Sequence, residues 1–215
     1  MKKASAASLL ILLCLCAKGA SGGDPVLSLQ RTGNREYHLQ ARLTVDAPVE
    51  TVWAVLTDYD HLDNFIASLK RSSLLEKKGK ERLVEQESVG RFFIFQKTFH
   101  LLLRVREEPR TKIEFYDISK RDFDSYQGSW RLEPLPGKTV IIYDLQAAIG
   151  RRTPRLFLEG SFRKTATQLL REIEEEIRRR SASIGRSVSP PTPLLHYSTW
   201  HRQINKQYNC IIFYN

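Results

Sequence analysis

The sequence has little cysteine. Its 215 residues include three, Cys14, Cys16 and Cys210. The first two lie in an apolar N-terminal run that is typical of an export signal, so cleavage would leave only Cys210. A chain with one cysteine cannot hold an internal disulfide, and no Cys/His spacing in the sequence is typical of a zinc site. We therefore expect neither a disulfide nor a bound metal.

Motifs of known catalytic chemistry are also lacking. The sequence contains no nucleophile elbow and no phosphate-binding loop. A general base must sit beside a partner that positions it, whereas the histidines are scattered along the chain, at His38, His61, His100, His196 and His201. We name no catalytic residue, expect no cofactor, and regard the protein as more consistent with a binding protein than with an enzyme.

Acidic residues are missing from both ends of the chain, which accounts for much of its net charge of +10. No acid precedes Asp24 or follows residue 185, and six cations lie in these two segments. The middle of the chain carries 28 cations and 24 acids, a net charge of only +4. That is not the charge pattern of a nucleic-acid-binding protein, so we expect no nucleic-acid partner.

Residues 1–22 have the pattern of a secretory signal peptide. Lys2 and Lys3 precede an apolar run from Leu9 to Ala17, and small residues follow. The run is too short to span a bilayer. We therefore expect export, to the periplasm or the outside if the source is bacterial, with an uncleaved anchor as the alternative. Residues 23–36 are polar and predict a flexible lead-in.

The next segments alternate between apolar and polar residues, as half-buried strands do. Tyr37 to Val45 is the first strand, and two short helices follow it, near 48–56 and 62–66. Six further strands are predicted, near 68–77, 83–89 with a turn at Gly90, 92–106, 112–118, 126–133 and 139–147. Consecutive strands with short turns pair antiparallel.

The longest amphipathic segment runs from Thr153 to Arg180. Thr153 suits the N-cap and Pro154 the first helical position. Apolar or small residues recur every three or four positions, as on one face of a helix, at Leu158, Phe162, Ala166, Leu169, Ile173 and Ile177. We predict an α+β domain over 37–182, a curved antiparallel sheet of about seven strands around this helix. Residues 183–215 contain three prolines and stay unassigned, as a tail or an added strand.

Two sequence motifs resemble a known superfamily. The segment from Val45 to Asp60, VDAPVETVWAVLTDYD, resembles the first strand and helix of START-like, polyketide-cyclase and coenzyme Q-binding proteins. Gly128-Ser-Trp130, followed by an apolar strand and a long helix, resembles the coenzyme Q-binding and cyclase branch. The resemblance covers about residues 37–180. It implies a helix-grip fold in which an apolar ligand is held between the sheet and the C-terminal helix.

On that fold, residues with inward positions become candidates for ligand contact. They are mostly aromatic and come from several strands and both helices: Trp53, Phe93, Phe95, Lys97, Phe99, Phe115, Trp130, Tyr143 and Phe162. Each aromatic could equally fill a closed core. Lys97 could contact a polar head group, or a bulge could turn it outward. The acids near Asp58 favour turn and cap chemistry over a metal site.

A cationic cluster precedes the long helix. Arg151, Arg152 and Arg155 lie beside Phe157, and these four are candidates for transient contact with an anionic membrane. The alternative is a solvated loop.

The sequence thus favours an exported, non-enzymatic binding or carrier protein for an apolar small molecule, a lipid or an isoprenoid quinone. The alternative is a polyketide-type cyclase or dehydratase, and a weaker third hypothesis is an interaction module with a closed interior. A polar pair deep in the cavity would favour the enzyme, and only Lys97, Tyr126 and Tyr143 are candidates for it.

Overall fold

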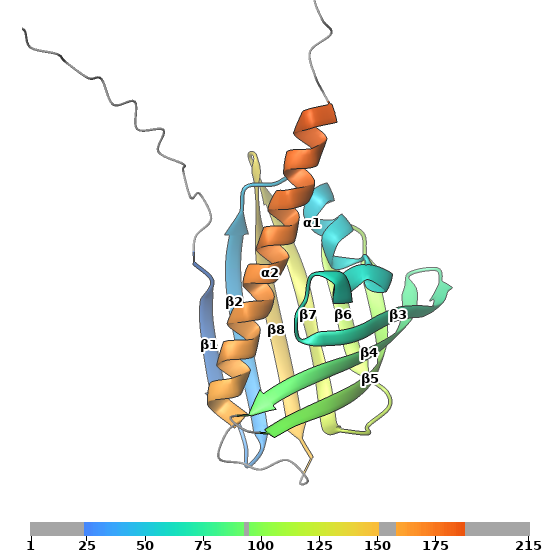
Figure 1. Cartoon of the computed structure of the whole chain (residues 1–215), viewed down its shortest axis with the longest axis vertical. Coiled ribbons are helices and arrows are strands. Elements are labelled where there is room, and N and C mark those ends of the chain that lie inside the picture. Colours follow the sequence, from blue (N-terminus) through green and yellow to red (C-terminus); the bar gives the residue numbers. More distant parts are fainter. Residues whose placement is uncertain (1–23, 93–94, 151–157, 188–215) are drawn as a thin grey trace, which may run out of the picture.

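The computed structural model describes residues 24–92, 95–150 and 158–187. Eight antiparallel strands form one sheet in the order β1-β2-β8-β7-β6-β5-β4-β3. The sheet is open and curved, and the long helix α2 lies against its concave side (Figure 1). The predicted α+β class, with a curved antiparallel sheet around a C-terminal helix, is confirmed.

The strands run in chain order apart from one long return. β1 is Val26–Arg31, β2 is Glu36–Val45, β3 is Leu69–Lys78 and β4 is Glu81–Phe92. β5 is Phe95–Glu108, β6 is Lys112–Asp117, β7 is Phe123–Leu135 and β8 is Lys138–Ile149. Because β8 pairs with both β2 and β7, the last strand joins the first two strands to the rest of the sheet.

The helices lie where the sequence placed them, with shifted ends. α1 spans Val49–Leu56, the 3-10 helix η1 spans Tyr59–Asn64, and α2 spans Leu158–Ser187. Pro48 holds the N-cap position of α1, and Asp46, two residues earlier, pairs with Lys138 at 2.9 Å. Part of the expected helix start, Thr153 and Pro154, lies outside the described residues.

Three boundaries differ from the sequence prediction. Residues 26–31 were expected to be a flexible lead-in, but they form β1, because their extended backbone pairs with the free edge of β2 from Val26↔Arg42 to Arg31↔Tyr37. Gly90 was expected in a turn, but it pairs with Lys97 within the β4–β5 ladder. α2 also continues past residue 182. Residues 1–22, which are expected to be a signal peptide, and residues 188–215 lie outside the described part.

The core follows from the alternation in the strands. In β2 the buried residues are every second one, ending in Leu43 and Val45 at 1% and 2% exposure. On α2 the buried apolar residues are Ala166, Leu170, Ile173 and Ile177, spaced by three or four as a helix face requires. Within the described residues, no helix is both long and apolar enough to cross a membrane.

Candidate functional site: an apolar cavity between the sheet and α2

A cavity of about 230 Å³ lies between the sheet, η1 and the first half of α2. An engineered cavity of roughly 150 Å³ is enough to bind benzene, so this interior has room for a small apolar molecule or one part of a larger one. α2 lies over only part of the concave side of the curved sheet (Figure 1).

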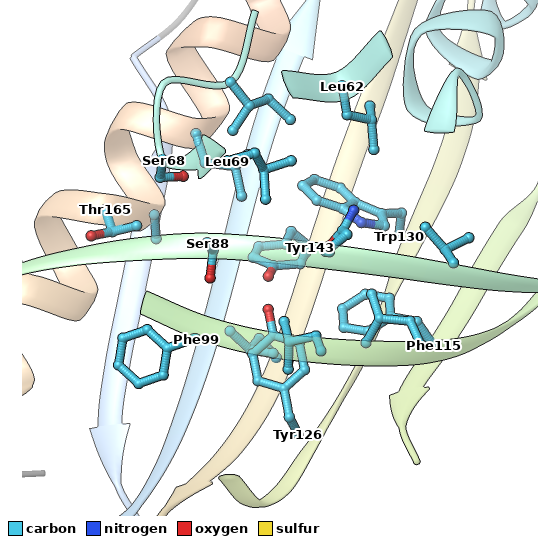
Figure 2. Close-up of a pocket in the computed structure, with 18 of the residues that line it drawn as sticks. Leu62, Ser68, Leu69, Ser88, Phe99, Phe115, Tyr126, Trp130, Tyr143 and Thr165 are labelled. Atoms are coloured by element: carbon cyan, nitrogen blue, oxygen red, sulfur yellow. The ribbon is translucent and has the colours of Figure 1, made fainter. Parts of the chain in front are cut away.

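Aromatic rings form a continuous wall on the sheet side of the cavity. Each ring touches the next, with centroid distances from 4.0 to 6.5 Å. Such separations are typical of attractive aromatic pairs. In order, the wall is Phe99, Phe123, Tyr126, Phe115, Tyr143 and Trp130. Figure 2 shows five of these side chains gathered in the cavity.

The cavity reaches the surface between α2, the end of β4 and the η1–β3 connection. Lining residues there are only partly buried or exposed: Ser68, Leu69, Ser88, Val89, Gly90, Phe162, Thr165 and Leu169. Ser68, Ser88 and Thr165 come from three separate elements (Figure 2). We call this set the mouth of the cavity.

Two tyrosines place polar atoms inside the cavity. Their hydroxyl groups point toward each other (Figure 2), and a hydrogen bond links Tyr126 with Tyr143. Burial raises the pKa of Tyr126 to about 12, although the hydrogen bond from Tyr143 opposes this shift. Burial, followed by the nearby Tyr126, also raises the pKa of Tyr143 well above its usual value. Both phenols therefore keep their protons at neutral pH.

The described lining contains no Asp, Glu, Lys, Arg or His. Across the described residues there is also no group of three or more side chains suited to hold a metal ion. Chemically, this part of the site offers apolar contact and neutral hydrogen-bonding groups.

Five of the nine ligand-contact candidates line the cavity: Phe99, Phe115, Trp130, Tyr143 and Phe162. Phe162 also stacks on Tyr37, with a centroid distance of 5.4 Å. Phe93 lies outside the described residues, as does the side chain of Phe95. The membrane-contact candidates Arg151, Arg152, Arg155 and Phe157 also lie outside them.

The lining does not include Trp53 or Lys97. Only Leu56, in the last turn of α1, reaches the cavity from that helix, while Trp53 packs against the core beside it. The Lys97 ammonium lies 3.2 Å from Asp122 Oδ1 and 4.8 Å from the Phe99 ring centroid. Paired with a carboxylate, it lies outside the cavity wall, so ligand contact by either residue stays a prediction.

Several lining residues were missed as candidates. Tyr126 is not one of them: it shares a strand face with Gly128 and Trp130, and the sequence already makes it a candidate for a polar pair in the cavity, though not for ligand contact. Phe123 could not be placed in this way, because a register shift between Phe123 and Ser125 changes the face on which it falls. Leu62 lies in the short 3-10 helix η1, Ile66 in the connection after it and Leu69 at the first position of β3, where too few regular residues are present to show a period.

Known proteins share this architecture. The Zhui aromatase/cyclase from a Streptomyces species has a TM-score of 0.58 and 19% identity, covering 68% of this chain and 96% of its own. A STAR-related lipid transfer protein from Xanthomonas axonopodis has a TM-score of 0.55 and 14% identity, and the match covers 71% of this chain and 98% of that protein. A human lipid transfer and protein localization domain has a TM-score of 0.55 and 12% identity, and the match covers 72% of this chain and 85% of that domain. The shared feature is a START-like helix-grip fold.

The sequence itself also identifies the family. No curated protein sequence matches the chain. The sequence model of the family described as "Polyketide cyclase / dehydrase and lipid transport" matches residues 45–174, which is more than half of the chain. The chain therefore belongs to the polyketide cyclase/dehydrase and lipid transport family.

Proposed function

We propose that the protein is a non-enzymatic binding or carrier protein for an apolar small molecule, a lipid or an isoprenoid quinone, held between the sheet and α2. The observation that carries the proposal is the cavity of about 230 Å³, whose sheet wall is a continuous series of aromatic rings. Burial of apolar surface contributes roughly 25 cal/mol per Å² before ordering costs. Binding in this cavity would draw mainly on that term.

The size of the cavity constrains how a long ligand is held. It can take a ring or a chain segment, so the remainder of a lipid or quinone would leave through the mouth. The mouth mixes apolar Leu69 and Leu169 with the hydroxyl groups of Ser68, Ser88 and Thr165. Such a border suits the transition from an apolar segment inside to a more polar part outside.

The second candidate function is a polyketide-type cyclase or dehydratase. It is favoured by one observation, the polar pair Tyr126 and Tyr143 inside the cavity. A general base works best when its pKa lies near the operating pH. The pKa of Tyr126 is about 12 and that of Tyr143 is also raised, so the pair suits hydrogen bonding better than proton abstraction.

Trp130 can report on binding, because it lines the cavity and stacks on Tyr143 at 4.0 Å. We expect decylubiquinone or a short-chain phosphatidylcholine to change the tryptophan emission of the purified chain in a saturable way. Trp130→Phe should remove most of that change, whereas Trp200→Phe should keep it. If neither ligand changes the emission and the chain turns over polyketide-like substrates instead, the carrier hypothesis is wrong and the cyclase or dehydratase hypothesis replaces it.

We also propose that the protein is exported and meets anionic membranes transiently. The sequence of residues 1–22 supports export, and N-terminal sequencing from an exporting host tests it; an intact Met1 in the cytoplasm would rule it out.

Arg151, Arg152 and Arg155 support membrane contact, at about 1 kcal/mol for each cation near the surface. Replacing all three by Ser should weaken flotation with anionic vesicles. A parent that does not float at low salt would refute this contact.

A further inference from the structure

The two cavity tyrosines come from neighbouring strands. Tyr126 lies opposite Ala147, and Tyr143 lies opposite Trp130, four positions further along β7. At about 3.3 Å per residue, four positions separate the two backbones by roughly 13 Å along the strands. The side chains span this separation from both ends and bring their hydroxyl groups together above the sheet (Figure 2). These two hydroxyl groups, which we call the polar point of the cavity, therefore come from two distant backbone positions.

The rings in contact with these two tyrosines are apolar or aromatic, although the cavity is also lined by Gln86 and by the mouth residues Ser68, Ser88 and Thr165. Tyr126 contacts Phe115 and Phe123, with centroid distances of 5.9 and 4.9 Å, and Tyr143 contacts Trp130. Polar groups in such a place are costly unless they are hydrogen-bonded. Two phenols carry two protons and several lone pairs, and one bond between them uses only one proton. The pair can thus donate and accept a further hydrogen bond within the cavity.

The same surroundings disfavour a charged group. The described lining offers no cation to pair with a carboxylate or a phosphate, and no acid to pair with an amine. An ionised group buried without a partner is far more costly than a neutral one. Because both phenols stay protonated at neutral pH, the pair itself adds no charge.

We propose that the Tyr126–Tyr143 pair determines the specificity of the cavity, selecting an otherwise apolar ligand that inserts a neutral hydroxyl or carbonyl oxygen. This inference rests on the proposed function, because it concerns the same cavity. It narrows the ligand class: pure hydrocarbon segments gain nothing from the pair, and carboxylate or phosphate groups stay outside the mouth.

The test uses three small probes that differ in one group: naphthalene, 2-naphthol and 2-naphthoate. Each is measured by equilibrium dialysis at pH 7 against the parent chain and the double variant Tyr126→Phe/Tyr143→Phe. Replacing both partners by apolar groups of the same shape leaves no unpaired hydroxyl behind, so the variant should fold. Tyr116→Phe is the matched control, since Tyr116 is 46% exposed on β6.

We expect the double variant to bind 2-naphthol about fivefold to tenfold more weakly than the parent, the size of one net hydrogen bond. It should bind naphthalene as tightly as the parent, which also shows that the cavity persists. The parent should bind 2-naphthoate more weakly than 2-naphthol, and Tyr116→Phe should match the parent throughout.

Other outcomes separate this inference from the proposed function. If the double variant binds both neutral probes as the parent does, the cavity takes apolar molecules but the tyrosines do not select among them. If the parent prefers 2-naphthoate, the selection for a neutral oxygen is wrong. If the parent binds none of the probes, the carrier proposal fails together with the inference.

Discussion

Among single residues, Tyr59 shows how the cavity wall is kept free of charge. Its ring lines the cavity, while its hydroxyl donates to Glu107 Oε1 at 2.8 Å. The other carboxylate oxygen of Glu107 lies 2.6 Å from Arg82 Nη2. Burial, followed by the neighbouring Glu107, raises the pKa of Tyr59. The carboxylate is thus satisfied behind the wall, and only the ring of Tyr59 faces the cavity.

Gly128 marks the point where the aromatic wall lies closest to the backbone. A methyl group at this position would collide with the backbone carbonyl oxygen of Asp144 on β8 and would lie 2.6 Å from Phe115 Cζ. Neither the paired strand nor the packed ring can move away freely. The glycine of the Gly128-Ser-Trp130 motif is therefore required by packing.

We predict that Gly128→Ala lowers the free energy of unfolding by about 1–3 kcal/mol, the usual cost of overpacking. Gly33→Ala is the control, because its added methyl group would meet the flexible end of the Glu36 side chain. Urea midpoints measure both changes. Equal midpoints for the two variants would show that β7 and β8 separate easily at this point.

Among elements, the contact of α2 with the α1–η1 region closes one end of the domain. Arg180 on α2 donates to Asp58 Oδ2 and to Glu176 Oε1, both at 2.7 Å, and to the Ala54 carbonyl at 3.3 Å. His61 Nδ1 lies 2.7 Å from the other Asp58 oxygen. Nearer the mouth, Glu172 accepts from the Ala67 backbone amide at 3.2 Å. Polar contacts thus hold η1 and its connection to β3 against α2.

The pKa shifts of this cluster predict how stability depends on pH. Burial would raise the pKa of Asp58, but hydrogen bonds from His61 and Arg180 hold it below its usual value. Hydrogen bonds from Arg179 and Arg180 outweigh burial and lower the pKa of Glu176. A carboxyl group whose pKa is lowered by folding stabilises the folded state at pH values above its unfolded-state pKa. This stabilisation is lost as the pH falls through its folded-state pKa.

His61 acts in the opposite direction. Its hydrogen bond to Asp58 raises its pKa, with Asp60 adding to the effect. The stabilisation that His61 contributes is fully present at pH values below its unfolded-state pKa of about 6.5. It is lost as the pH rises through the raised pKa of the folded state.

We therefore expect the contribution of this cluster to Tm to be highest between about pH 4.5 and 6.5, and Tm to fall at lower and at higher pH. Asp58→Asn should flatten both limbs, and His61→Gln only the alkaline limb. Glu133→Gln is the control, because its ion pair with Arg42 is exposed and such pairs contribute little. An unchanged Tm profile in Asp58→Asn would mean that the cluster does not tie α2 to η1.

Sequence alone was enough for the regular elements apart from β1, which was expected to be a flexible lead-in. Alternation in Tyr37–Val45 and helical spacing from Ala166 to Ile177 each followed from one buried face, so the core and five of the cavity residues were found. Positions set by irregular backbone could not be found in the same way. The bulge beside Phe123, the lining from η1 to Leu69 and the pairing of Lys97 with Asp122 depend on tertiary contacts that no local period encodes.

For the whole molecule, the cavity is a consequence of the proportions of the fold. Eight strands curve around one helix, and the strands β3, β4 and β5 bend across the front of the sheet (Figure 1). In its C-terminal half α2 packs Ile173 and Ile177 into the core, and of these two only Ile173 also lines the cavity. Near its first half the helix presents Phe162, Ala166 and Leu169 to the cavity. The interior is thus packed at one end and open at the other.

The central claim, that an apolar ligand occupies this cavity, is tested most directly by filling it. Ala166 is 6% exposed and lines the cavity, whereas Gln168 on the same helix is exposed. Titration calorimetry with decylubiquinone compares the parent chain, Ala166→Trp and Gln168→Trp. We predict one ligand per parent chain, the same for Gln168→Trp, and an affinity at least about tenfold lower, 1.4 kcal/mol, for a folded Ala166→Trp. Parent-like binding by Ala166→Trp, or its failure to fold because the interior has no room for the indole, would contradict the account.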